Sequence, residues 1–222
     1  KTMYWNTVNE LLKQTLIRIM AAPAFNPFRL AGGTSLSLQF GHRISVDIDL
    51  FTEADYGSID FTVFDKWFSM NFNVVETNTA LIPGLGKSYY IGTDADHLVK
   101  ADIYYSDQFI RPHINSGGIR LADKDDIIAM KLDIMGRGTG KCGRKKDFWD
   151  IHAATDIYRL NTMIGFYLER YPYGHSIKEI KEGLTDFSVA EDDFDPICLK
   201  GKHWELIKLD FTNWLKADKI TS

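Results

Sequence analysis

The most constraining feature of this sequence is the run Ser45–Phe51, in which polar residues alternate with apolar ones. This period of two predicts a β-strand with one wet face and one buried face. Asp47 and Asp49 are two residues apart, so they point to the same side, with Cα atoms roughly 6.6 Å apart at about 3.3 Å rise per residue. The run therefore predicts two carboxylates that converge on one face of a sheet.

The chemistry of Asp47 and Asp49 favours a metal site at this face. Two carboxylates so close would repel each other without a cation, which would raise the pKa of one of them. Carboxylate oxygens are ligands that magnesium accepts, and two-metal sites for phosphoryl transfer hold their ions about 3.5–4 Å apart. The alternative is a solvated strand face that happens to carry two aspartates. Aspartate is a poor strand former, so its use twice, just after a glycine turn, favours the metal.

The segment before this strand reads as a short strand, a glycine turn and a helix. Phe28–Ala31 is apolar enough for a buried strand, Gly32 and Gly33 interrupt it, and a helix is expected from about Thr34 to Phe40. The free N–H groups and the positive dipole end of such a helix suit a phosphate. Alternatively, Thr34 or Ser35 simply caps the helix. No GxxxxGK[ST] sequence follows, so a Walker-type site is not predicted.

Periodicity divides the whole chain into a region of mixed strands and helices, residues 1–121, and a helical region, residues 122–222. The expected helices are 3–20, 60–71, 123–136, 145–157, 160–170, 175–183 and 201–217; the expected strands are 72–79, 87–92 and 97–105. Turns are expected at Pro83-Gly84 and Thr93-Asp94, and an acidic loop at 184–200.

Composition narrows the class of protein. The formal net charge of −4 argues against a protein that coats nucleic acid but permits a local basic site. No apolar run approaches the roughly eighteen residues needed to span a bilayer, and Cys142 and Cys198 lack the spacing of a zinc site. We therefore expect a soluble protein of a reducing cytoplasm, without a membrane partner. Lys1 is neither an initiator Met nor part of a signal segment, so we expect a trimmed chain.

Basic residues supply further candidates. Lys131 lies within an apolar helical stripe, where a buried ammonium should meet an acid or a phosphate unless it reaches the surface. The segment 137–146 has five basic residues and three glycines, which suits a triphosphate or a nucleic-acid backbone as well as a plain solvated loop. Arg43 could hold phosphate or pair with a local acid.

Several segments together resemble the AbiEii/AbiGii toxin nucleotidyltransferases, within the polymerase-β-like superfamily. The residues that carry the resemblance are Leu30–Leu36, His42–Phe51, Ile128–Leu132, Arg137 and Lys146–Ile151. They span most of residues 28–151, and the last third of the chain carries little of the resemblance. The resemblance implies an α+β fold, with a mixed β-sheet flanked by helices as the nucleotidyltransferase core and a C-terminal helical region that contributes Lys131 and Asp147 to the cleft.

The resemblance also implies the roles of individual residues. Asp102 looks like the third carboxylate of the superfamily, although it could instead pair with Lys100; Asp147 could instead serve the dipole of its helix. The implied catalytic residues are Asp47, Asp49, Asp102, Lys131 and Asp147, of which the first three are the metal ligands. The implied residues for the nucleoside triphosphate (NTP) are Gly32, Gly33, Thr34, Arg43, Ser45, Lys131 and Arg137. One or two magnesium ions are the implied cofactor.

The resemblance finally implies a biological setting. Such a chain is the toxin of a toxin–antitoxin or phage-defence system, has a cognate antitoxin, and transfers a nucleoside monophosphate to an RNA such as a transfer RNA (tRNA). Two alternatives stay open from the sequence: transfer to a protein, and a degenerate member that binds nucleotide or RNA without transfer.

Overall fold

The computed structural model describes residues 2–78 and 85–218. By their contacts the residues form two compact units: Lys1–Gln39 with Ser45–Asp123, and Phe40–Ile44 with Lys124–Ser222. The short segment 40–44 thus belongs to the second unit, although the first unit flanks it on both sides in the sequence. The predicted turn at Pro83-Gly84 lies outside the described residues.

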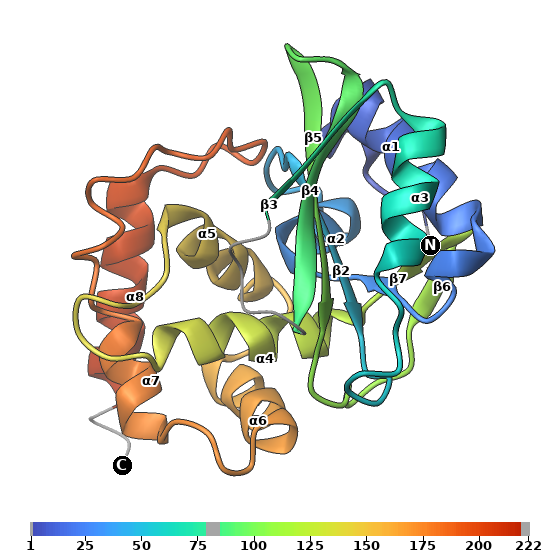
Figure 1. Cartoon of the computed structure of the whole chain (residues 1–222). Coiled ribbons are helices and arrows are strands. Elements are labelled where there is room, and N and C mark those ends of the chain that lie inside the picture. The colour runs from blue at the N-terminus through green and yellow to red at the C-terminus, as the bar shows by residue number, and fades with distance from the viewer. Residues whose placement is uncertain (1, 79–84, 219–222) are drawn as a thin grey trace. The chain divides into compact units, whose positions relative to one another are not determined.

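The first unit is built on a seven-stranded mixed sheet of order β3-β4-β5-β2-β1-β7-β6 (Figure 1). Its strands are β1 (Arg29–Leu30), β2 (Asp47–Thr52), β3 (Val74–Asn78), β4 (Gly86–Asp94), β5 (His97–Tyr105), β6 (Ile114–Ser116) and β7 (Ile119–Leu121). Strand pairs β2·β5 and β1·β7 are parallel, and the other pairs are antiparallel. The predicted mixed sheet with flanking helices is confirmed, and the β6–β7 hairpin was not predicted.

Helices α1 (Glu10–Ala21) and α3 (Thr62–Asn71) cover one face of this sheet. The first unit also contains α2 (Gly32–Phe40, whose last residue joins the second unit) and the single 3-10 turns η1 (Trp5–Thr7) and η2 (Pro23–Phe25). Apolar side chains of α1 and α3, such as Leu16 and Phe68, form one core with Ile48, Leu50 and Ile103 of the sheet. Strand residues alternate between faces, so this packing leaves the odd-numbered positions of β2 on the opposite face.

The second unit is helical. It consists of α4 (Lys124–Met135), α5 (Lys145–Ala154), α6 (Leu160–Arg170), α7 (Ile177–Gly183) and α8 (Trp204–Asp218). Helix α4 has contacts with α5, α6 and α7, and α5 packs on α8. Phe148 lies in the middle of this core and is fully buried against Phe187, Trp204 and Phe211.

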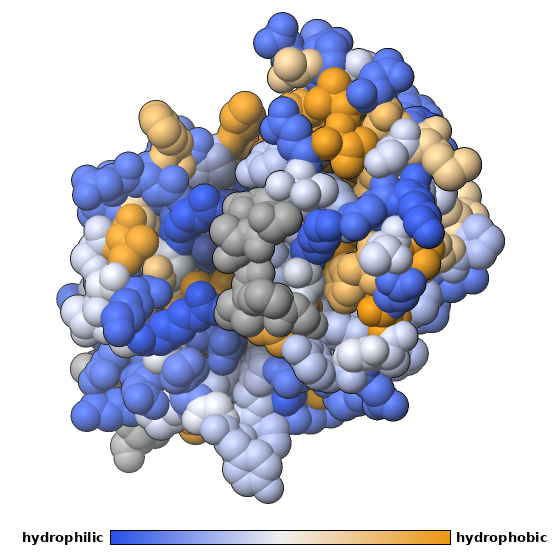
Figure 2. Space-filling model, in the orientation of Figure 1, coloured by the Kyte–Doolittle hydropathy of each residue, from blue (hydrophilic) through white to orange (hydrophobic). Residues whose placement is uncertain are grey.

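Apolar side chains also occur on the surface, although hydrophilic residues dominate it. Figure 2 shows hydrophobic residues on the visible face as separate patches among hydrophilic ones. Within residues 2–78 and 85–218, none of the helices combines the length and the apolar character needed to cross a bilayer.

Candidate active site

The two strand aspartates lie together on the wet face of the sheet. Burial alternates along β2, with Ile48 and Leu50 fully buried while Asp47 and Asp49 are only half-buried. Strand β5 runs parallel to β2 and places Asp102 opposite Asp49, and Lys100 opposite Asp47. The predicted convergence of Asp47 and Asp49 on one face is what the structure shows, and Asp102 joins them in register.

Asp102 is held by two neighbours on this face. Lys100 Nζ lies 2.6 Å from Oδ2, and Ser88 Oγ donates a hydrogen bond of 2.6 Å to Oδ1. Asp102 therefore does pair with Lys100, as the alternative interpretation of the sequence proposed. The pair lies on the same face as Asp47 and Asp49, so it does not separate Asp102 from them. Burial lowers the pKa of Lys100, yet Asp102 and Asp47 outweigh that effect and raise it above its ordinary value. Lys100 thus balances part of the negative charge of the face.

The donor atoms on this face suit a hard cation. They are carboxylate and hydroxyl oxygens, which magnesium prefers over nitrogen or sulfur ligands. Across residues 2–78 and 85–218, no three or more histidine, cysteine, aspartate or glutamate side chains are arranged to hold a metal ion. Metal binding by Asp47, Asp49 and Asp102 stays a prediction, which the position and chemistry of the carboxylates favour.

The glycine turn places the start of α2 against one of these carboxylates. The helix begins at Gly32, whose φ of 62° is in the left-handed region that favours glycine. A Cβ atom at Gly32 would lie 2.0 Å from Asp49 Oδ2, far inside van der Waals contact. Gly32 is therefore required twice, by the backbone conformation and by the approach of the Asp49 carboxylate.

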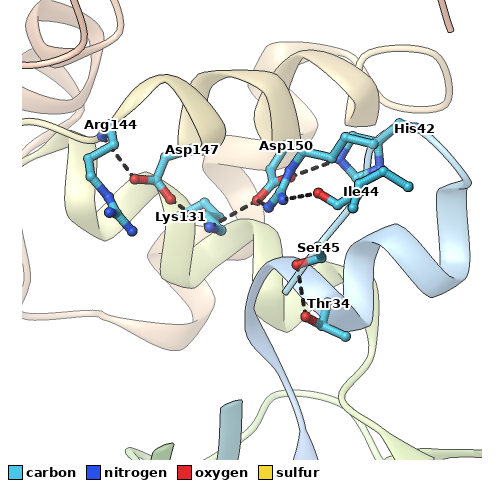
Figure 3. A network of polar contacts seen from close by, with 9 residues as sticks. Thr34, His42, Ile44, Ser45, Lys131, Arg144, Asp147 and Asp150 are labelled. Atoms are coloured by element: carbon cyan, nitrogen blue, oxygen red, sulfur yellow. Dashed lines mark hydrogen bonds and ion pairs between the residues drawn. The ribbon is translucent and has the colours of Figure 1, made fainter. Parts of the chain in front are cut away.

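The rest of the turn is tied to the first residues of β2. Gly33, Thr34 and Ser35 lie inside the first turn of α2, so neither hydroxyl residue is the N-cap, contrary to the alternative interpretation of the sequence. The Thr34 and Ser45 side chains face each other in Figure 3, with Thr34 Oγ1 and Ser45 Oγ 2.8 Å apart, and Thr34 Oγ1 donates to the backbone carbonyl of Asp47. Thr34 and Ser45 thus fix the register of Asp47 against α2, and NTP binding by these residues stays a prediction.

Replacing Gly32 with Ala is expected to remove most nucleotide-dependent activity, because the new methyl group displaces Asp49. Gly57→Ala is the matched control, since Gly57 has a φ of 83° but a Cβ there meets nothing within 4 Å. Both variants should lose about 1 kcal/mol of folding free energy from backbone strain. Denaturant unfolding and NTP turnover would be measured for both, and similar turnover in the two variants would contradict the role given to Gly32.

In the second unit, Lys131 is buried between two acids of α5. Its Nζ lies 2.6 Å from Asp147 Oδ1 and 2.9 Å from Asp150 Oδ2, and the lysine is only 7% exposed (Figure 3). The prediction that this ammonium meets an acid is confirmed. Burial lowers the pKa of Lys131, but the two carboxylates more than offset it, so its pKa is raised and the side chain stays charged.

Asp147 has two tasks at the start of α5. One oxygen binds Lys131, and the other accepts a 2.9 Å hydrogen bond from the backbone N–H of Arg144. The second contact satisfies the helix terminus, as the alternative interpretation proposed. Both interpretations of Asp147 are therefore compatible with its position.

Asp150 is the centre of this network, and the sequence did not reveal it. It is fully buried, and its carboxylate binds Lys131, Arg43 and His42. The Arg43 guanidinium makes two contacts, of 2.7 Å through Nε and 2.9 Å through Nη2. Arg43 thus pairs with an acid that is distant in the sequence rather than local, and phosphate binding by Arg43 stays a prediction. The signal available in the sequence was the need of Lys131 for a partner, together with an acid one helical turn after Asp147.

The charges around Asp150 fix its ionisation. Burial raises the pKa of Asp150, but Arg43, Lys131 and His42 lower it well below its ordinary value. Burial lowers the pKa of His42, and the charges of Arg43 and Lys200 add to this effect. Asp150 opposes it, but the net pKa of His42 is below its ordinary value. At neutral pH the network therefore contains one carboxylate, two cations and a neutral histidine, before Asp147 is counted.

The basic loop after α4 is pinned rather than loose. Cys142 Sγ donates to the carbonyls of Met135 and Gly138 at 3.3 Å each, and Gly140 N donates to Asp186. Arg137 is exposed on this loop, as are Lys141 and Arg144. The loop therefore presents cations to solvent from a fixed backbone.

Comparison with known proteins identifies the family of this chain. The family model for the nucleotidyl transferase AbiEii toxin of type IV toxin–antitoxin systems matches residues 14–172. An uncharacterized protein, aq_aa25 of Aquifex aeolicus, is 28% identical over 145 residues, which is 63% of each chain, so this chain spans less than two thirds of that relative.

Solved structures show the same fold at low sequence identity. A candidate nucleotidyltransferase from H. pylori has a TM-score of 0.61 at 18% identity, with 94% of each chain covered. MenT4, a nucleotidyltransferase toxin of Mycobacterium tuberculosis, has a TM-score of 0.56 at 14% identity, with 93% of this chain and 79% of MenT4 covered. The predicted polymerase-β-like nucleotidyltransferase fold is confirmed. The family model spans every predicted site residue and more than half of the sequence, and the chain belongs to the AbiEii nucleotidyltransferase toxin family.

Proposed function

We propose that this protein transfers a nucleoside monophosphate from an NTP to an acceptor hydroxyl, with magnesium as the cofactor and pyrophosphate as the second product. The observation that carries the proposal is the pair Asp47 and Asp49 on the wet face of β2, with the start of α2 packed against Asp49. Carboxylates beside free N–H groups at a helix start are the two elements needed to bind a cation and a phosphate chain together.

The proposed reaction is an in-line displacement at the α-phosphorus. The acceptor oxygen forms a bond to the α-phosphorus, the bond to the bridging oxygen of the β-phosphate breaks, and pyrophosphate leaves. Asp102, oriented by Lys100 and Ser88, receives the proton of the acceptor hydroxyl. Asp47 and Asp49 would hold magnesium, which neutralises charge on the phosphate oxygens when bound.

Lys131 is proposed to bind the triphosphate from the second unit. An ammonium has three N–H donors, and Asp147 and Asp150 use two of them in the described contacts. The third is assigned to a phosphate oxygen, with Asp147 and Asp150 as the groups that orient Lys131. Joint action of Lys131 with the strand aspartates stays a prediction, as do the contributions of Arg43 and Arg137.

The proposed acceptor is RNA, in particular the acceptor end of a tRNA. Two observations support this choice: the family belongs to toxin–antitoxin systems, and Arg137, Lys141 and Arg144 are exposed on one pinned loop. Cations on a fixed backbone suit the phosphates of a nucleic acid, although the net charge of the chain is −4. A cognate antitoxin would then be the cellular partner.

The deciding experiment incubates the protein with bulk RNA and each α-labelled NTP in turn, with magnesium or with a chelator. Label is expected on RNA of tRNA size, with one preferred nucleotide, and only with magnesium present. Label on protein alone would replace RNA with a protein acceptor. NTP binding by calorimetry without any transfer would show a degenerate member and would refute the proposed activity.

A further inference from the structure

The two cysteines of this chain have opposite hydrogen-bond roles. The buried Cys142 thiol donates to two carbonyls, which stabilises its protonated form. Cys198 is half-buried, and its sulfur accepts hydrogen bonds from the backbone N–H groups of Lys200 and Lys202, at 3.4 and 3.3 Å. Amide donors aimed at a sulfur stabilise the thiolate, so the two side chains provide a reactive thiol and an internal control.

Cys198 lines a small pocket of the second unit together with two buried polar side chains. The pocket has a volume of about 10 Å³, room for one water-sized group, and His42 and Trp149 are also part of its lining. Both are over nine-tenths buried, being 2% and 3% exposed. Within the described part of the chain, His42 Nδ1 has no hydrogen-bond partner. The Trp149 side-chain N–H interacts with the Cys198 sulfur, whose pKa it lowers. The pocket therefore offers a sulfur, an N–H group beside it and one unsatisfied acceptor to one small polar group.

The ionised state of Asp150 determines which ring nitrogen of His42 carries the proton. Asp150 is a carboxylate and can only accept, so His42 Nε2, 2.7 Å from Oδ1, must carry the proton of the neutral ring. His42 Nδ1 is then an acceptor. Trp149 Nε1–H is a donor only. One acceptor and one donor match a single hydroxyl group, which has one proton to give and lone pairs to accept.

We propose that Cys198 is a site of reversible oxidation by a peroxide, and that the resulting sulfenic acid is held by His42 and Trp149. The Cys198 thiolate attacks one peroxide oxygen, the S–O bond forms and the O–O bond breaks. The leaving hydroxide takes a proton from solvent to become water, so sulfur is oxidised and the peroxide is reduced. The sulfenic O–H donates to His42 Nδ1, and its oxygen accepts from Trp149 Nε1–H.

Further features of the chain agree with this assignment. Burial raises the pKa of the Cys198 thiol, but the side-chain N–H of Trp149 and the backbone N–H groups of Lys200 and Lys202 leave the net pKa below its ordinary value. Burial raises the pKa of Cys142 instead, and Asp186 adds to the effect. The backbone also links Cys198 to Arg43 by a β-bridge, and Leu199 N donates to His42 O. Oxidation would thus act on the side chain and on the backbone of the segment that binds Asp150.

The test oxidises the intact folded protein with a small excess of hydrogen peroxide and traps sulfenic acid with dimedone, followed by peptide mass spectrometry. Cys198 is expected to carry at least ten times more dimedone adduct than Cys142. Cys198→Ser should abolish the adduct, and Cys142→Ser should leave it unchanged. Equal labelling of the two cysteines, or no adduct and no higher oxide at Cys198, would overturn the proposal.

A delay between peroxide and dimedone tests the pocket itself. In the native sequence the trapped fraction should persist through the delay, because His42 Nδ1 accepts from the sulfenic O–H and the Trp149 N–H, which interacts with the sulfur before oxidation, donates to the new oxygen. In Trp149→Phe it should decay several times faster, with folding checked by circular dichroism. Equal decay in the two proteins would refute the role assigned to Trp149. None of these measurements depends on nucleotide transfer, so they stand or fall apart from the proposed function.

Discussion

Asp49→Asn is expected to lower the rate of nucleotide transfer about a thousand-fold. This is the usual cost of losing one charged group that stabilises the transition state, in which charge shifts among the phosphate oxygens. The substitution keeps the shape of the side chain and its place over Gly32, but an amide cannot replace a carboxylate as an anionic ligand. Turnover of labelled NTP over a range of magnesium concentrations measures the loss. Full activity in Asp49→Asn would refute the assignment of the active site to this face.

Stability measurements separate this effect from misfolding. Asp49→Asn removes one of two neighbouring negative charges, so the free energy of unfolding should change by no more than about 1 kcal/mol. Asp96→Asn is the matched control, because Asp96 is exposed in the turn between β4 and β5 and loses the same charge. Magnesium with NTP should raise the melting temperature of the native protein and of Asp96→Asn, but not of Asp49→Asn. A similar rise in all three proteins would place the cation elsewhere.

Asp150→Asn is expected to lower the free energy of unfolding by about 3–5 kcal/mol, the usual cost of removing one partner from a buried ion pair. The substitution leaves the buried cations Arg43 and Lys131 with less negative charge. Lys131 also loses one of the two groups that orient it, so we expect NTP turnover to fall at least ten-fold at temperatures where the variant is folded. Chemical denaturation and turnover would be measured on the same preparation.

Asp126→Asn is the matched control for this prediction. Asp126 is fully buried and pairs with Arg170 at 2.7 Å, but no described contact joins it to Lys131. It should lose a similar amount of stability while keeping its turnover. If both variants lost turnover equally, the effect of Asp150 would be general destabilisation rather than positioning of Lys131.

The stability difference between the native protein and Asp150→Asn should depend on pH in a defined direction. The pKa of Asp150 is lowered in the folded state, so the folded chain binds fewer protons there than the unfolded chain. Its contribution is complete above the unfolded pKa of about 3.9 and is lost as the pH falls toward the folded pKa. The gap between the two proteins should therefore be constant near neutral pH and shrink below about pH 4.

Local periodicity was sufficient to predict most elements of the fold. The helix predicted at 160–170 has those bounds in the structure, and α3 and α4 differ from their predictions by at most two residues. The β6–β7 hairpin was missed because each strand has only three residues, too few to show a period of two. The shared face of Asp47 and Asp49 also followed from period alone, since it needs no knowledge of distant contacts.

Long-range pairings were beyond the reach of the sequence. The register that sets Asp102 opposite Asp49 depends on which strands become neighbours, and β2 pairs with β5 across more than fifty residues. Arg43 and Asp150 are 107 positions apart, and nothing near either residue marks the other. For Lys131 the sequence predicted only that the buried ammonium needs an acid or a phosphate as a partner. The identity of the second acid became clear once α4 and α5 were seen to pack together.

The excursion of residues 40–44 into the second unit bears on how the chain is made. During synthesis His42 and Arg43 leave the ribosome more than a hundred residues before Asp150, so the first unit can form its central strand pairs while these two side chains still lack their partner. The second unit is thus assembled from two stretches of the chain that are synthesised at different times. A fragment that starts at Lys124 would contain Asp150 and Lys131 but not His42 and Arg43. Dividing the gene between residues 123 and 124 would therefore leave the buried Asp150 carboxylate without two of its three partners among the described residues.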